Sequence, residues 1–318
     1  MGARIASLFD GWKAFQSSSW YRAFQIAIIA LSVGLMLRAL LSPLSQIAVA
    51  DLHVDMVALL SGLLLTWIAF GLGTLAWAEI VQALQPEVRY SRAIKYHLLS
   101  VVAKYLPGVG WQQVSKAVQL HRDGVPLSQT WLPVSLELGL TLLTGVATAL
   151  QTLSSTQRTI SRMEFGREVY WAAALLFWVI CATMPLAAWK LANPRPLAPD
   201  VIRKFVFHLY LAELLDVVGW LLFGAALWSI AQGVASLPLE VLPYCIVVLA
   251  LSVIVGLVVV IVPNGYGVRE LTMSTLLQTI LPLPVSIIVA LLSRVVLVAA
   301  EFLGVLPLIL ISLRRWRK

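Results

Sequence analysis

Residues 262–270, VPNGYGVRE, break a long apolar segment of the sequence. They follow the run YCIVVLALSVIVGLVVVI (244–261), which has no charged residue and is long enough for a transmembrane helix. Pro263 and two glycines interrupt this helix, and Arg269 and Glu270 place opposite charges beside the interruption. Lipid cannot hydrogen-bond an irregular backbone, so such a break at membrane depth must be buried in protein or line a wet cavity.

The composition of the whole chain indicates a polytopic membrane protein. Of its 318 residues, 60% are hydrophobic and 12% are charged, and the mean hydropathy is +0.90. We expect an all-α fold with about six full spans and two broken or re-entrant hairpins, or about eight crossings if the second hairpin spans the membrane. The predicted membrane segments are 22–42, 57–84, 127–151, 169–191, 208–231, 244–262, a shorter 268–282, and 284–312.

The distribution of Lys and Arg predicts the orientation in the membrane. The net charge of +8 is explained by basic loops, so we expect no nucleic-acid partner. Most of the basic residues lie in the first 22 residues, in 85–126, in 189–207 and in the tail 313–318, whereas the loops 43–56 and 232–243 contain none. The positive-inside rule then places both termini in the cytoplasm. Cytoplasmic termini require an even number of crossings, which predicts that 244–282 enters the membrane and returns.

An earlier break, KYLPGVGWQ (104–112), resembles the later one and lies about half a chain length before it. Each break follows two spans and precedes a long one, which predicts two inverted repeats. Paired interruptions of this kind indicate a transporter's binding site. The predicted regions are an amphipathic helix on the membrane surface (1–21), a first repeat (22–151) with a hairpin at 86–124, an external loop (152–168), a second repeat (169–312) with a hairpin at 244–282, and a basic tail (313–318).

The two breaks also supply a candidate binding site for an anion. Glycine lets the backbone approach a ligand closely, and the helix restarting at Val268 points its positive end at the break. Arg269 adds a donor suited to phosphate. The candidate substrate-binding residues are Lys104, Pro107, Gly108, Gly110, Gln112, Lys116, Asn264, Gly265, Gly267, Arg269 and Glu270. The alternative is a structural turn beside a solvated Arg269–Glu270 ion pair.

Ionisable residues inside the predicted spans are a second set of candidates. Each costs roughly 2.5–3.5 kcal/mol on insertion scales, and such residues usually face the protein interior. We expect Glu137, Asp216, Arg294 and Glu301 to line a polar cavity, in which Glu137 or Asp216 carries a proton. The alternative is an ion pair that only fixes the helix register.

Other polar residues have simpler interpretations. Glu79 lies near the end of its span and is expected to snorkel, and His97 is expected at the membrane interface. The chain has no HExxH, GxSxG or Walker motif, and its two cysteines have no metal-like spacing. We therefore predict neither a metal nor a cofactor. Asp51 and Asp55 flank a histidine in ADLHVD, where a solvated loop and an enzyme site remain open.

The quoted motifs resemble those of the lysylphosphatidylglycerol synthase/flippase membrane-domain family. The resemblance rests on KYLPGVGWQQVSKAVQLHRDGV, on Glu137 in the next span and on VPNGYGVRE, and it extends from about residue 20 to 312. The sequence departs from the family pattern at Val109, Lys116, Asn264 and Tyr266. The resemblance implies a two-repeat membrane fold that moves or presents a phospholipid. It also implies self-association, so a homodimer is expected. We expect the chain to be a stand-alone member of the family, without the soluble aminoacyl-transfer domain.

Together these patterns predict a lipid translocase, or flippase, of the cytoplasmic membrane rather than an enzyme. The expected substrate is a phosphate-bearing lipid: a phospholipid, an aminoacyl-phospholipid or a polyprenyl-phosphate sugar. The alternative is a membrane glycosyl- or headgroup transferase with a lipid-linked donor, whose carboxylate would be Asp51, Glu137 or Asp216. A third interpretation is a scaffold subunit with no activity of its own.

Overall fold

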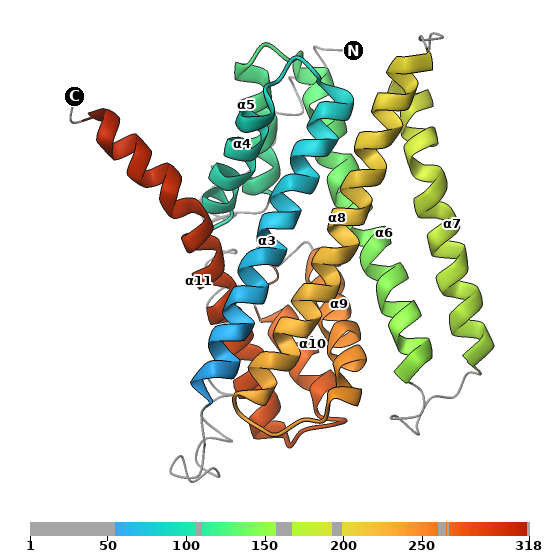
Figure 1. Cartoon of the computed structure of the whole chain (residues 1–318), viewed down its shortest axis with the longest axis vertical. Helices are drawn as coiled ribbons and strands as arrows, with labels where there is room; N and C mark the ends of the chain where they lie inside the picture. The colour runs from blue at the N-terminus through green and yellow to red at the C-terminus, as the bar shows by residue number, and fades with distance from the viewer. Residues whose placement is uncertain are drawn as a thin grey trace, which may run out of the picture.

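The computed structural model of the chain describes residues 55–105, 110–156, 167–192, 199–259, 265 and 267–316. The regular elements of these residues are all helices (Figure 1). Several predictions fall outside the described residues: the surface helix 1–21, the span 22–42, Asp51, Pro107, Gly108 and Asn264.

Five helices of the described ranges are long and apolar enough to cross a membrane. They are α3 (Met56–Leu84), α6 (Leu127–Thr156), α8 (Pro199–Gln232), α9 (Leu242–Val258) with the preceding 3₁₀ turn η2 (Leu239–Val241), and α11 (Leu283–Trp316). The helix α7 (Arg167–Ala192) contributes a shorter apolar stretch, Trp171–Met184. The described chain is therefore an all-α membrane protein, as the composition predicts.

Several helix ends differ from the predicted ones. α8 begins at Pro199, well before the predicted residue 208, because proline and the acidic Asp200 both favour a helix start. Glu213 and Asp216 therefore lie deep inside α8. α9 stops at Val258, before the predicted end at 262. α11 continues to Trp316 and takes up most of the predicted tail.

Two hairpins of shorter helices correspond to the two breaks. The first consists of α4 (Tyr90–Ala103) and α5 (Trp111–Arg122), and the second pairs α9 with α10 (Val268–Leu277), which is shorter than the predicted 268–282. In both hairpins the returning helix begins directly after a glycine with φ of +81°, Gly110 or Gly267. Side chains with a Cβ disfavour this left-handed region, which explains the glycines at these two places.

The hairpins approach the middle of the molecule from opposite ends (Figure 1). α3 and α8 pack side by side and run in opposite directions between the hairpins. Several other contacts come in pairs: α3–α4 with α8–α9, α4–α5 with α9–α10, α5–α6 with α10–α11, α6–α9 with α11–α4, and α3–α11 with α8–α6. The contacts of α7 with α6 and with α8 have no such pair among the described residues.

Small residues allow the helices to pack closely, which matters in a bilayer because lipid is as apolar as the helix surfaces. A Cβ atom at Gly224 of α8 would lie 2.3 Å from a side-chain atom of Ile246 of α9. A Cβ atom at Gly145 of α6 would lie 2.7 Å from the Trp220 ring of α8. These glycines set the distance between the helices that surround the centre of the molecule.

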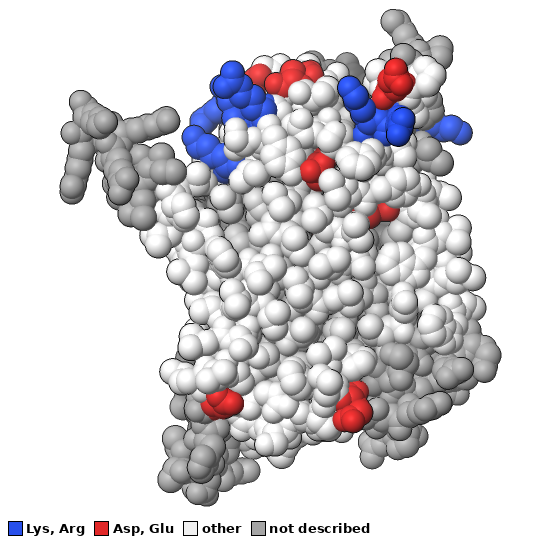
Figure 2. Space-filling model, in the orientation of Figure 1, with Lys and Arg blue, Asp and Glu red and all other residues white. Residues whose placement is uncertain are grey.

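On the face of the molecule that Figure 2 shows, most exposed charged side chains lie at the two ends. On the face that Figure 2 shows, Lys and Arg gather at the end that carries α4 and α5, and a broad band below them is almost uncharged. The opposite end of this face shows acidic side chains and, among the described residues, no basic one. The band fits an apolar belt of the kind a membrane protein turns to lipid.

Candidate functional site

A polar cavity lies between the two hairpins in the middle of the helix bundle. It has two lobes of about 180 and 200 Å³ that share seven lining residues, so they form one space. Gln112 and Glu137 line the first lobe, and Arg269 lines the second. The charged residues common to both lobes are Lys104, Asp216 and Glu301.

The last turn of α4 is tied to α11 at this cavity. The ammonium of Lys104 donates a hydrogen bond to Glu301 and forms an ion pair with it. The hydroxyl of Tyr105 donates to the other carboxylate oxygen of Glu301 at 2.6 Å. The Tyr105 ring stacks on Phe302 with 5.8 Å between ring centroids. One carboxylate of the second half therefore holds the tip of the first hairpin.

The second hairpin brings Arg269 to the same cavity, but not as an ion pair with Glu270. Instead, Glu270 is buried, and its Oε1 lies 3.6 Å from the Nε of Arg294 in α11. Its Oε2 accepts the backbone N–H of Gly267 at 2.8 Å, which caps α10. The solvated Arg269–Glu270 pair considered from the sequence is therefore not formed. Among the described residues, the Arg269 guanidinium has no hydrogen bond or ion pair.

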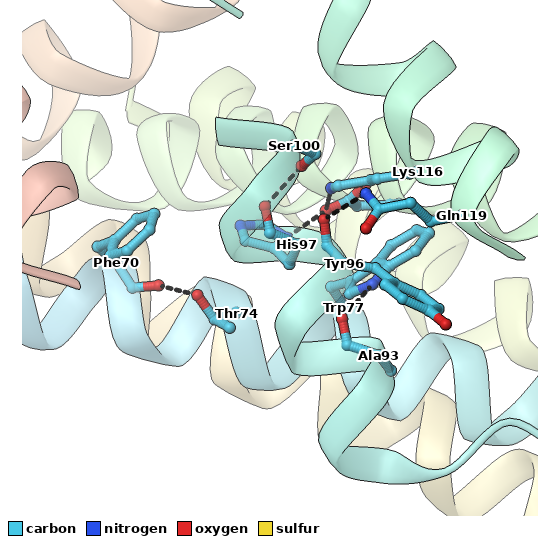
Figure 3. Close-up of polar contacts among 10 residues, drawn as sticks. Phe70, Thr74, Trp77, Ala93, Tyr96, His97, Ser100, Lys116 and Gln119 are labelled. Carbon is cyan, nitrogen blue, oxygen red and sulfur yellow. Dashed lines mark hydrogen bonds and ion pairs between the residues drawn. The ribbon is translucent and has the colours of Figure 1, made fainter. Parts of the chain in front are cut away.

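A second ion pair lies deeper in the first half. Lys116 of α5 places its ammonium 2.6 Å from both carboxylate oxygens of Glu137 in α6, and its side chain is only 2% exposed. The ammonium also lies 4.3 Å from the centroid of the Trp77 ring. His97 lies near Lys116 (Figure 3), and its Nδ1 is 3.5 Å from Oε1 of Glu137. Lys116, a candidate substrate contact by sequence, is thus enclosed by protein groups.

Asp216 lines the cavity without a cation beside it among the described residues. Its Oδ2 accepts a hydrogen bond from the hydroxyl of Thr144 in α6. That hydroxyl in turn accepts the indole N–H of Trp220 at 3.2 Å. Glu213, one turn before Asp216, is 8% exposed, and its Oε1 has no partner among the described residues.

Several of these contacts were not predicted from the sequence. His97 is buried within the protein. Glu79 does not snorkel to solvent: it is buried, its Oε1 accepts the Tyr90 hydroxyl at 2.8 Å, and its Oε2 lies 2.6 Å from His208. Burial and the bond to Glu79 raise the pKa of Tyr90. The sequence around His97 and Glu79 gives little indication of these contacts, because each partner lies on another helix.

Asp55, one of the two acidic residues of the ADLHVD loop, has a structural role. Its carboxylate accepts the backbone N–H of Val57 at 2.8 Å and of Ala58 at 3.3 Å, and so caps the start of α3. Within the described ranges, no three His, Cys, Asp or Glu side chains gather as a metal site would need.

Comparison with protein-family models and with curated proteins finds no match to this chain. The resemblance to the lysylphosphatidylglycerol synthase/flippase family therefore stays a prediction from the quoted motifs.

Proposed function

We propose that the protein is a lipid translocase that carries a phosphate-bearing headgroup through the central cavity while the acyl chains stay in the bilayer. The observation that carries this proposal is the Arg269 guanidinium, which lines the cavity and has no partner among the described residues. A guanidinium suits the geometry of phosphate and binds it bidentately. A cation held inside an apolar bundle is costly without an anion, so an anionic ligand stabilises it.

Lys104 supports the same interpretation from the other hairpin. It lines the same lobe as Arg269, and its present partner is Glu301. A phosphate entering this lobe would meet one cation from each half of the molecule. The shared chemistry covers phospholipids, aminoacyl-phospholipids and polyprenyl-phosphate sugars, because all of them carry a phosphate next to the lipid.

We also infer that the molecule consists of two inverted repeats, 22–151 and 169–312. The matched helix contacts support this division, as do the two returning helices that start after a glycine with φ of +81°. The basic end in Figure 2 supports a cytoplasmic location for the α4–α5 end under the positive-inside rule. A binding site between inverted repeats suits transport by alternating access.

The test is lipid movement in proteoliposomes that contain the purified chain and acyl-labelled fluorescent phosphatidylglycerol. Dithionite added outside quenches the label of the outer leaflet, so the remaining signal reports transfer between leaflets. We expect the native chain to accelerate transfer and Arg269→Gln to slow it about tenfold or more, because a charged hydrogen bond contributes about 1.5–3 kcal/mol.

The matched control is Arg122→Gln, which removes an exposed arginine at the end of α5 and should leave the rate unchanged. Equal rates for Arg269→Gln and the native chain would contradict the proposal. A new covalent lipid product that depends on Asp51 would instead favour the transferase.

A further inference from the structure

Asp216 is a carboxylate of the cavity that the proposed lipid binding does not use. It lines both lobes, and within the described part of the chain no Lys, Arg or His forms an ion pair with it. The other carboxylates that line the cavity are matched to cations, as Glu137–Lys116 and Glu301–Lys104. Glu213 lies outside the lining and has no ion pair among the described residues.

The hydrogen bonds around Asp216 suit both of its protonation states. When Asp216 is ionised, the Thr144 hydroxyl donates to it, as observed. When Asp216 is protonated, its new O–H can donate to Thr144, and the Thr144 proton can turn to the Leu140 carbonyl, 2.9 Å away. Trp220 donates to the Thr144 oxygen in either case. Asp216 can therefore bind and release a proton without leaving a buried polar group unpaired.

Within the described residues, one cation and one carboxylate of the cavity lining, Arg269 and Asp216, have no ion-pair partner. The titratable groups that face it are Glu213 on α8 itself, Glu137 on α6, Cys181 on α7, Glu301 on α11, Lys104 at the end of α4 and Arg269 on α10. The residues that α3 and α9 turn to the cavity are apolar or glycine. Because Lys104 pairs with Glu301, Arg269 and Asp216 remain as the cavity-lining charges that have no ion pair among the described residues.

We propose that Asp216 is a proton-binding site whose protonation is coupled to binding of the lipid phosphate beside Arg269. This inference rests on the proposed function. An ionised Asp216 repels a phosphate in the same cavity, and one proton taken from water removes that charge by forming a carboxylic acid. After the headgroup leaves, the O–H bond breaks and the proton returns to water. A proton gradient can thereby drive lipid movement.

Linkage makes the proposal measurable without any transport. If protonation strengthens phosphate binding, phosphate binding must strengthen protonation by the same factor. The purified full chain in detergent is titrated with dihexanoyl-phosphatidylglycerol by calorimetry, in two buffers of different ionisation enthalpy at one pH. The difference in heat gives the number of protons taken up. We expect net uptake by the native chain and none by Asp216→Asn.

Glu213→Gln is the matched control, because it removes the neighbouring buried acid from the same helix but not from the cavity lining. It should keep the native proton uptake. Binding by the native chain without uptake, or uptake that persists in Asp216→Asn, would overturn the coupling alone. If no binding heat appears in any buffer, the proposed function fails, and the coupling fails with it.

A second experiment distinguishes a proton from a positively charged headgroup as the partner of Asp216. Proteoliposomes with an imposed pH gradient carry labelled phosphatidylglycerol or labelled phosphatidylethanolamine. We expect the gradient to accelerate movement of phosphatidylglycerol by the native chain and to have no effect on Asp216→Asn. If Asp216→Asn instead loses only phosphatidylethanolamine movement, Asp216 pairs with the amine, and the proton-site proposal is overturned.

Discussion

Lys104 and Glu301 form an ion pair across 197 residues of sequence, from the tip of the first hairpin to the last helix. Both lie in the lining of the cavity, and their side chains are 14% and 5% exposed. Tyr105 holds the second oxygen of Glu301, so the carboxylate fixes two consecutive residues of the hairpin. The pair therefore joins the two halves of the molecule at the place where a headgroup is proposed to bind.

Removing one partner of this pair should destabilise the protein more than removing both. Glu301→Gln leaves the buried ammonium of Lys104 unmatched, which we expect to lower the free energy of unfolding by about 3–5 kcal/mol. The double variant Lys104→Met with Glu301→Leu should recover most of that loss but should not move lipid. Thermal unfolding in one detergent and the leaflet assay measure the two effects. An unchanged melting temperature for Glu301→Gln would contradict this prediction.

The Lys116–Glu137 pair provides a comparison, because its ammonium is enclosed by Trp77 and the carboxylate. Glu137→Gln should again cost about 3–5 kcal/mol, and Lys116→Met with Glu137→Leu should recover it. Here we expect the double variant to keep moving lipid, since the pair mainly ties α5 to α6. A stable double variant without lipid movement would place this pair in the transport path.

The second break should tolerate a side chain less well than the first. Gly265 has φ of +63°, and a Cβ atom there would lie 3.0 Å from the Cα and the carbonyl oxygen of Gly256. Gly110 has φ of +81° with open space around its Cβ position. Gly110→Ala should cost only the left-handed strain of about 1–2 kcal/mol, and Gly265→Ala should cost more. Equal melting temperatures for the two variants would argue against the close approach.

Membrane orientation can be tested with single cysteines at the two charged ends. Cys181 and Cys245 are both buried, so they should react little with a membrane-impermeant maleimide. Arg122 and Glu240 are exposed, in α5 and η2 respectively. We expect Arg122→Cys to react only after the cells are opened and Glu240→Cys to react in intact cells. Labelling of both positions from the same side would contradict hairpins that enter from opposite sides.

The helices and the breaks could be predicted because their signals are local. Long apolar runs give the spans, and the Pro-Gly stretches end the helices for steric reasons that hold in any fold. The apolar run predicts a later start for α8 than the structure shows. Residues 199–207 are helical but too polar to be part of that run. Pro199 and Asp200 favour a helix start there, which hydropathy does not report.

The ionisable residues of the site were identifiable from the sequence, but their pairing was not. Glu137, Glu301 and Arg269 are conspicuous as charges in or beside apolar segments. The neighbouring sequence does not indicate that Glu301 pairs with Lys104 or that Glu270 pairs with Arg294, because the pairing depends on which helices pack together. For the same reason the contacts of His97 and Glu79 could not be predicted, because their partners lie on neighbouring helices.

We propose that a lipid phosphate binds between the two hairpins. The most direct measurement is an electron cryo-microscopy structure of the full chain in nanodiscs that contain phosphatidylglycerol. We expect phosphate density within hydrogen-bonding distance of Arg269 and adjacent to Lys104, with acyl chains leading out between helices to the bilayer. A well-resolved cavity without lipid density, with phosphates confined to the outer belt of the protein, would contradict it.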